Sequence, residues 1–172
     1  MLLSGSYRFV RARAFAIALA LSLPVCAAPV NAARAASEIV VVITKVTALD
    51  AADVWLAGPD DFYARVTIDG EIFTTRIKRQ QNRAEPNWKI SKVVYGRMHT
   101  VRLEIFDKDL FKGDDKIDIN RVNAKRDLDF TVDTRRCRIG GFSQSFRCGD
   151  PIRREGYEPK KAAIEFYVDV VR

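Results

Sequence analysis

After residue 36 the chain is a series of short apolar or alternating segments separated by turn residues. β-Branched and aromatic residues dominate these segments, and in several of them every second residue is apolar, which is typical of β-strands. No stretch of useful length shows the apolar spacing of an amphipathic helix. The segments that we predict as strands are residues 38–46, 62–68, 71–79, 88–94, 100–106, 116–122, 127–132 and 162–171.

Short strands separated by turns predict an all-β fold, an eight-stranded antiparallel β-sandwich made of two sheets. The Asp69-Gly70 pair between the second and third strands is a strong hairpin signal. Residues 133–161 are too many for a hairpin loop, so we expect them to form an excursion before the last strand. The chain shows no internal repeat and no low-complexity linker, and we predict one monomeric domain over residues 37–172.

The first 36 residues follow a different pattern and contain no acid. Arg8, Arg11 and Arg13 precede an apolar run over residues 14–25, and a stretch rich in small residues follows. Positive charge, an apolar run and a small-residue cleavage region, in this order, are typical of a secretory signal peptide, which we place at residues 1–32. We therefore expect an exported protein, either periplasmic or extracellular.

Two alternatives to cleavage remain open. A retained membrane anchor is disfavoured, because the apolar run is short and ends at Pro24. Lipid attachment at Cys26 is the second alternative. The residues Leu23-Pro24-Val25-Cys26 resemble a bacterial lipobox, although Val25 stands where that motif has a small residue.

Charge and composition narrow the class of protein. The chain has 29 Lys and Arg against 22 Asp and Glu, a net charge of +7. Residues 1–32 hold three arginines and no acid, so the remaining 140 residues carry a net charge of +4. A chain of this length buries roughly two-thirds of its unfolded surface, enough for one ordinary core. The composition excludes a disordered or histone-like chain, makes nucleic acid a poor partner, and offers no later membrane span.

Cysteine usage agrees with export. Cys137 and Cys148 are the two cysteines left after cleavage, and they enclose a segment that contains two glycines. An even pair in an exported chain predicts a disulfide, which would contribute about 2–3 kcal/mol to the free energy of unfolding by closing this loop. Two reduced cysteines are the alternative if the chain is not exported.

The inventory of reactive residues argues against an enzyme. The single histidine, His99, has no metal-ligand spacing around it, and we treat it as a surface or packed residue. Residues 141–145 (GFSQS) lack the final glycine of a nucleophile elbow, and no phosphate-binding glycine loop is present. Catalysis by a pair of carboxylates is the one enzymatic mechanism for which the sequence still holds the residues, because it has many acids. We predict a binding protein without catalytic residues.

Acidic residues gather in two connections between predicted strands. Two of them end the strand over residues 100–106 at neighbouring same-side positions, and two more follow Gly113. The first connection, residues 48–63, holds four. In chain order these acids are Asp50, Asp53, Asp60, Asp61, Asp107, Asp109, Asp114 and Asp115.

If both connections lie at one end of the sandwich, the carboxylates repel one another unless a cation is bound. Oxygen ligands in loops, with no Cys or His among them, select calcium over zinc or copper. An EF-hand is excluded, because Lys112 stands where that loop needs glycine. The alternative is that the acids are only polar turn residues.

Three segments carry a further pattern: residues 61–70 (DFYARVTIDG), 85–94 (EPNWKISKVV) and 101–117 (VRLEIFDKDLFKGDDKI). The first resembles the Asp-Pro-Tyr-Val-Lys-Val opening of a C2 domain, the calcium- and phospholipid-binding sandwich family. The second is similar to that family's Asn-Pro-x-Trp-Asn-Glu strand, and the third to its Val-x-Asp-x-Asp…Asp-Asp-x-Ile-Gly segment. The resemblance runs over residues 38–132 in the family's order and implies a C2-like sandwich.

The resemblance also implies the calcium ligands, which fall on Asp50, Asp61, Asp107, Asp109 and Asp115. The first connection is long, so Asp53 is an alternative to Asp50, and Asp60 and Asp114 are lesser candidates. Two positions depart from the family pattern, Phe62 in place of proline and Asp118 in place of glycine. Because the domain starts with the strand that precedes the first calcium loop, the resemblance implies the permuted topology of the family.

Apolar and basic residues near these acids predict a membrane surface as the partner. Large apolar side chains beside carboxylates suit insertion into a lipid interface, and basic side chains suit anionic headgroups. The apolar candidates are Trp55, Leu56, Leu110 and Phe111. The basic ones are Arg76, Lys78, Arg79 and Arg83, and we expect Arg76 and Lys78 to share one face of their strand and to act together.

We expect calcium-dependent binding to anionic phospholipid membranes. Two alternatives concern the side chains: Trp55 and Leu56 pack back on the sandwich, or the basic residues form only a solvated strand face. A third concerns function, a calcium-stabilised extracytoplasmic module that binds a protein or a glycan and has no lipid role.

Overall fold

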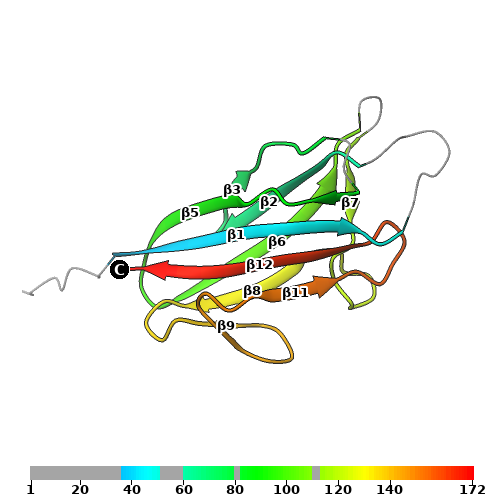
Figure 1. Cartoon of the computed structure of the whole chain (residues 1–172). Coiled ribbons are helices and arrows are strands. Elements are labelled where there is room, and N and C mark those ends of the chain that lie inside the picture. The colour runs from blue at the N-terminus through cyan, green and yellow to red at the C-terminus, as the bar shows by residue number, and fades with distance from the viewer. Residues whose placement is uncertain (1–35, 51–59, 80–81, 110–112) are drawn as a thin grey trace, which may run out of the picture. The chain divides into compact units, whose positions relative to one another are not determined.

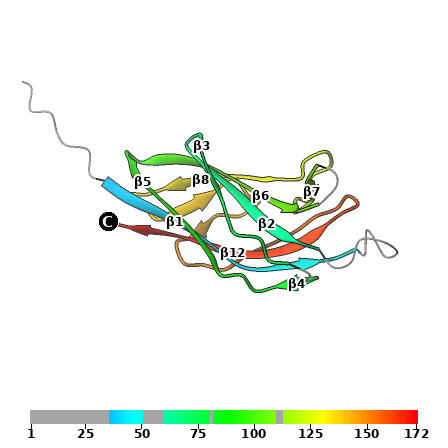
Figure 2. The ribbon, with the colours of Figure 1, turned by 90° about the horizontal axis from the view of Figure 1, so that it is seen from above.

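The structure is a computed structural model that describes residues 36–50, 60–79, 82–109 and 113–172, and these form two packed antiparallel sheets (Figures 1 and 2). The five-stranded sheet contains β1 (Ala36–Ala48), β4 (Arg83–Ala84), β5 (Trp88–Tyr95), β11 (Ile152–Glu155) and β12 (Ala162–Val171). The seven-stranded sheet contains β2 (Phe62–Ile68), β3 (Glu71–Thr74), β6 (Met98–Asp107), β7 (Asp115–Ile117), β8 (Leu128–Asp133), β9 (Arg138–Gly140) and β10 (Phe146–Arg147).

The core lies between the apolar faces of the two sheets. Ile39, Val41 and Ile43 occupy every second position of β1 and have no exposed surface. Leu103 and Ile105 do the same in β6. Burial of each such side chain contributes about 1.5–3 kcal/mol relative to exposure, so the period-two pattern of the sequence accounts for the sandwich.

All eight predicted strands are present, and the predicted all-β sandwich is confirmed. Four short strands were not predicted: β4, β9, β10 and β11. Two predicted strands are shorter than expected, since β3 ends at Thr74 instead of Arg79, and β7 ends at Ile117 instead of Val122.

A bulge ends β3. The Thr75 hydroxyl accepts the Ala64 N–H (2.9 Å), while the Thr75 N–H donates to the Ala64 carbonyl. The next bond to β2 joins the Lys78 N–H to the Phe62 carbonyl, so three residues on one strand face two on the other. One extra residue of this kind breaks the side-chain alternation. The expectation that Arg76 and Lys78 lie on one face of a regular strand is therefore wrong.

A buried carboxylate ends β7. Asp118 has no exposed surface, and its side chain accepts the N–H groups of Asn120 (2.9 Å), Tyr157 (2.7 Å) and Glu158 (2.6 Å). The Asp118 carbonyl lies where a Cβ on Gly156 would come within 2.1 Å, so a larger residue at position 156 does not fit. The aspartate that departs from the family pattern thus ties the end of β7 to the end of the excursion.

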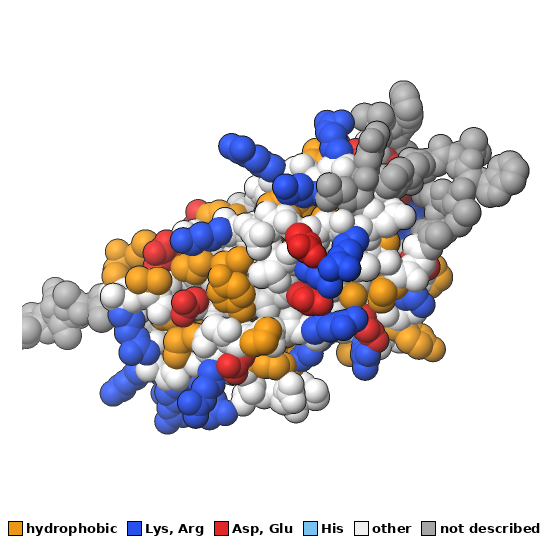
Figure 3. Space-filling view, in the orientation of Figure 1, with side chains coloured by type: hydrophobic (Ala, Val, Ile, Leu, Met, Phe, Trp, Pro, Cys, Tyr) orange, Lys and Arg blue, Asp and Glu red, His pale blue; other side chains and the backbone are white. Residues whose placement is uncertain are grey.

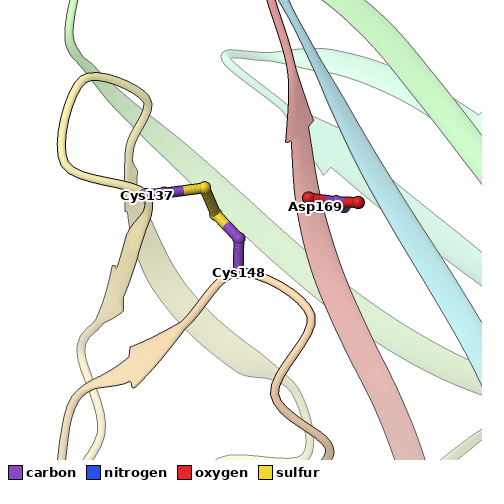
Figure 4. Close-up of side chains that lie close together, drawn as sticks. All are labelled: Cys137, Cys148 and Asp169. Carbon is purple, nitrogen blue, oxygen red and sulfur yellow. A yellow bond between two sulfur atoms is a disulfide. The ribbon is translucent and has the colours of Figure 1, made fainter.

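The excursion closes one side of the sandwich. Its β9–β10 hairpin extends the seven-stranded sheet beside β8, and its β11 extends the five-stranded sheet beside β12. A disulfide joins Cys137 and Cys148, whose Cα atoms are 5.2 Å apart, next to Asp169 of β12 (Figure 4). The predicted disulfide is confirmed, and its sulfurs are bonded to each other, so this group does not offer free thiolates to a metal.

No helix within the described ranges is long and apolar enough to span a bilayer. The predicted signal peptide and Cys26 lie outside the described residues.

Asp133 at the end of β8 is 7% exposed and makes the stability of the fold pH-dependent. Arg97 donates two hydrogen bonds to its Oδ2 (2.7 and 3.0 Å), and the N–H groups of Arg135 and Arg136 donate to its Oδ1. These bonds, with that of Arg97 the strongest cause, lower the pKa of Asp133 from 3.8 to about 2. The resulting stabilisation is complete above pH 3.8 and is lost as the pH falls through about 2.

We predict that Asp133→Asn lowers the free energy of unfolding at neutral pH and that most of its difference from the wild type is lost by pH 2. Urea unfolding at both pH values measures this. Glu85→Gln, which removes an exposed ion pair with Arg83, serves as the control and should change stability by less than about 0.5 kcal/mol. A loss at Asp133 that is equal at both pH values would contradict the assignment.

Candidate metal centre

The predicted ligands lie where four strands begin or end at one end of the sandwich. Asp107 is the last residue of β6, and in the strand register it faces Asp115, the first residue of β7. On its other side Asp107 faces Phe62, which follows Asp61 directly. Strand pairing alone therefore brings aspartates from three segments together, and Asp50 follows the end of β1 nearby.

Contacts confirm this convergence. The Asp61 N–H donates to Oδ1 of Asp107 over 2.7 Å, and the Lys108 N–H donates to the Asp61 carbonyl. Burial, followed by the charges of Asp109, Asp61 and Asp115, raises the pKa of Asp107. We call these four residues, Asp61, Asp107, Asp109 and Asp115, the aspartate cluster. Their like charges repel one another, and a bound cation would relieve that repulsion.

Asp50 fixes the far wall of the site. Its two carboxylate oxygens accept the N–H groups of Lys160 (3.0 Å) and Lys161 (2.9 Å), which hold the end of the excursion against the end of β1. Between these elements lies a hollow of about 10 Å³, close to the volume that one water-sized sphere needs. The residues that line this aspartate hollow are Ala48, Asp50, Asp60, Phe62, Asp107, Ile117, Lys160 and Lys161.

Two lysines neutralise part of the negative charge. The Lys160 ammonium forms an ion pair with Asp115, and the Lys108 ammonium pairs with Asp114 over 2.8 Å. Asp114 also accepts the Tyr63 hydroxyl (2.7 Å). The hydrogen bond from Lys108 and then that from Tyr63 lower the pKa of Asp114, whereas burial and then Asp114 raise the pKa of Tyr63 to about 12.

The donor set fits calcium. The aspartate cluster and the hollow beside it offer carboxylate oxygens, Oδ2 of Asp109 is buried, and no His or Cys is among these residues. Oxygen ligands of this kind suit a hard cation such as calcium. His99 lies elsewhere, at the start of β6, where it is 4% exposed and its Nδ1 is 2.6 Å from Oδ2 of Asp69.

The model of the C2 domain family matches residues 37–135 of the chain. The chain belongs to the C2 domain family. Among curated proteins, none matches its sequence.

Solved structures agree with the fold. A structure described as that of a C2 domain is 14% identical with a TM-score of 0.53, over 79% of this chain and 99% of that one. A structure of two C2 domains of Extended-Synaptotagmin 2 is 16% identical with a TM-score of 0.58, over 90% of this chain and 48% of that one. This chain thus spans about half of that two-domain structure. A calcium-bound structure of the same two domains is 15% identical with a TM-score of 0.53, over 78% of this chain and 45% of that one.

The structure describes only some of the other residues that we predicted for calcium or lipid binding by this C2 domain. Asp53, Trp55, Leu56, Leu110 and Phe111 lie outside the described residues. The basic candidates lie on the irregular segment after β3 and at the start of β4. Arg76, Arg79 and Arg83 are exposed and Lys78 is half-buried, while Arg83 pairs with Glu85.

Sequence reasoning missed the lysines of the site. Lys108 follows Asp107 in the sequence, so its closeness to the acidic residues could have been predicted. Lys160 is 45 residues from Asp115 and belongs to the excursion, whose path no motif predicted. The sequence showed only that Asp118 stands in place of the family's glycine. Its burial and its bonds to N–H groups of the excursion come from the structure.

The Lys160 ammonium neutralises Asp115 and would compete with a calcium ion for that carboxylate. We predict that Lys160→Met raises the affinity for calcium several-fold. The same change should lower the free energy of unfolding of the calcium-free domain, because it removes this ion pair. An ion pair of this exposure is worth up to about 1 kcal/mol, which corresponds to roughly a fivefold change in affinity. Calcium titration and urea unfolding measure the two effects.

Lys45→Met is the matched control, because Lys45 pairs with Glu165 at similar exposure but does not line the aspartate hollow. It should leave calcium affinity unchanged. Equal calcium affinity in the Lys160 and Lys45 variants would contradict the role of Lys160.

Proposed function

We propose that this C2 domain binds calcium at its aspartate cluster and that bound calcium recruits it to anionic phospholipid membranes. The observation that supports the proposal most is the convergence of Asp61, Asp107, Asp109 and Asp115, with the raised pKa of Asp107. The family and the synaptotagmin-like structures support a calcium- and membrane-binding module in general.

In this proposal the aspartate cluster and Asp50 hold the ion. Calcium neutralises the carboxylates and offers its remaining coordination positions to lipid phosphate. The chain supplies the rest: strand register keeps Asp107 and Asp115 opposite each other, and Asp50 keeps residues 160 and 161 in place. The domain acts by binding, not by catalysis.

Apolar and basic residues of the sequence would make the membrane contacts. Trp55, Leu56, Leu110 and Phe111 would insert their apolar side chains into the interface, at a gain of about 25 cal/mol per Å² of apolar surface buried. The basic residues of the segment after β3 would each add about 1 kcal/mol at an anionic surface. Residues 1–32 would direct the protein out of the cytoplasm as a signal peptide.

A second function has one specific observation in its favour. Carboxylates at this end already hold protein groups: Asp50 binds the backbone of residues 160 and 161, and Asp115 binds the Lys160 ammonium. Calcium in such a setting would brace the end of the sandwich for a protein or glycan partner. Trp55→Ala/Phe111→Ala separates the two functions, because it removes lipid binding and spares a purely structural calcium site.

We predict that the protein sediments with phosphatidylserine-containing vesicles in calcium and not in chelator. Asp107→Asn/Asp109→Asn should weaken this sedimentation about tenfold or more, because it removes ligand charge, and tenfold corresponds to only about 1.4 kcal/mol. The variant should fold, since the amide oxygen of the new side chain at position 107 can still accept the Asp61 N–H.

Asp150→Asn/Asp169→Asn is the control, with the same loss of charge at two exposed aspartates that lie outside the aspartate cluster and do not line the hollow beside it. It should sediment as the wild type does. Equal sedimentation of the wild type in calcium and in chelator would rule out a calcium switch.

A further inference from the structure

A second and larger hollow opens where the excursion packs on the sandwich. Its volume is about 800 Å³, within the range of small-molecule sites, and it shares no lining residue with the aspartate hollow. Its walls are the connection from β7 to β8, the start of β8, the turn after β9, and β11. The lining residues that matter below are Arg121, Lys125, Asp129, Phe142, Arg153 and Arg154.

Positive charge dominates this basic hollow. Four cationic side chains, Arg121, Lys125, Arg153 and Arg154, line it against two acids. Both acids are already held: Arg102 binds Asp129 through two hydrogen bonds (2.8 and 3.2 Å), and Arg121 pairs with Glu155. Among the residues that the structure describes, no carboxylate forms an ion pair with the other three cations. Figure 3 shows basic and acidic side chains intermixed in the middle of the face it presents.

Arg154 is held in a fixed position inside this hollow. Its guanidinium lies 4.4 Å from the ring centroid of Phe142 and 5.3 Å from that of Phe146, and its Nη1 donates to the Arg153 carbonyl over 2.7 Å. Burial and the charge of Arg121 lower the pKa of Arg154. A guanidinium that is immobilised and partly desolvated loses little entropy when it binds an anion.

The excursion shapes the wall that carries the aromatic rings. Gly141 has φ +99°, and a Cβ on it would lie 2.9 Å from the Cα of Phe130, so the turn packs directly on β8. The disulfide between Cys137 and Cys148 closes the hairpin that holds Phe142 and Phe146. The hollow is therefore a preformed feature of the fold.

We propose that the basic hollow binds a phosphomonoester whose apolar or planar part lies against Phe142. A phosphomonoester carries about −1.5 to −2 charges at neutral pH, which matches a hollow with three cations outside any ion pair of the described residues better than the single charge of a carboxylate or a sulfate ester does. One guanidinium group can donate two parallel hydrogen bonds to two oxygens of the same phosphate. The hollow is larger than a phosphate group, so it has room for the organic part of the ester as well. The ligand is either the headgroup of a membrane lipid or a soluble phosphomonoester.

Calorimetric titration of the full chain with phenyl phosphate tests the basic hollow. A chelator is present, so that calcium at the aspartate cluster does not contribute to the binding. Phenyl phosphate should bind, and phenyl sulfate, a monoanion, should bind about tenfold more weakly. Lys125→Ala/Arg153→Ala should weaken phenyl phosphate binding by about tenfold or more, and both residues are exposed, so the variant keeps its core.

Arg135→Ala/Arg136→Ala is the matched control, with the same loss of charge at two exposed residues that do not line the hollow. It should bind phenyl phosphate as the wild type does, and equal weakening in the two variants would overturn the proposal. Sedimentation with phosphatidic acid vesicles in chelator distinguishes the sources. Binding to these vesicles supports a lipid headgroup, binding to phenyl phosphate alone supports a soluble ligand, and binding to neither at millimolar concentration overturns the proposal.

Discussion

Repulsion between carboxylates that the strand register forces together is the constraint on which this end of the molecule depends. Asp107 cannot leave the cluster without breaking the pairing of β6 with β2 and β7, and these strands carry fully buried core residues such as Leu103 and Ile105. The free energy of the core thus holds like charges at short range, and burial, followed by the charges of these neighbours, raises the pKa of Asp107. A bound divalent cation would relieve the repulsion directly, and the proposed function follows from this property of the fold.

The excursion supplies the lysine that neutralises part of the negative charge of the aspartate cluster. Asp50 and Asp118 bind its backbone at residues 157–161, and these bonds place the Lys160 ammonium against Asp115. Farther back, the same excursion closes the sandwich with β9, β10 and β11 and forms the basic hollow. One segment, braced by a disulfide, therefore contributes a lysine to the acidic end and a cationic hollow to the side of the sandwich.

The fold and the acidic site were predictable to different extents. Period-two burial and Asp-Gly turn chemistry predicted all eight main strands, because both act over a few neighbouring residues. The convergence of Asp61, Asp107, Asp109 and Asp115 followed from the family pattern. The bulge at Thr75 was not predictable in this way, since it depends on a side chain taking an N–H from β2. Lys160 was also missed, because its position depends on long-range bonds to Asp50 and Asp118.

The most direct test is a calorimetric calcium titration of the domain beside Asp107→Asn/Asp109→Asn. We predict saturable binding by the wild type, at a dissociation constant of about 10⁻⁴–10⁻³ M as in extracellular calcium modules, and loss of that binding in the variant. Absence of binding at several millimolar calcium, or equal binding by the two proteins, would show that the aspartate cluster is not a calcium site.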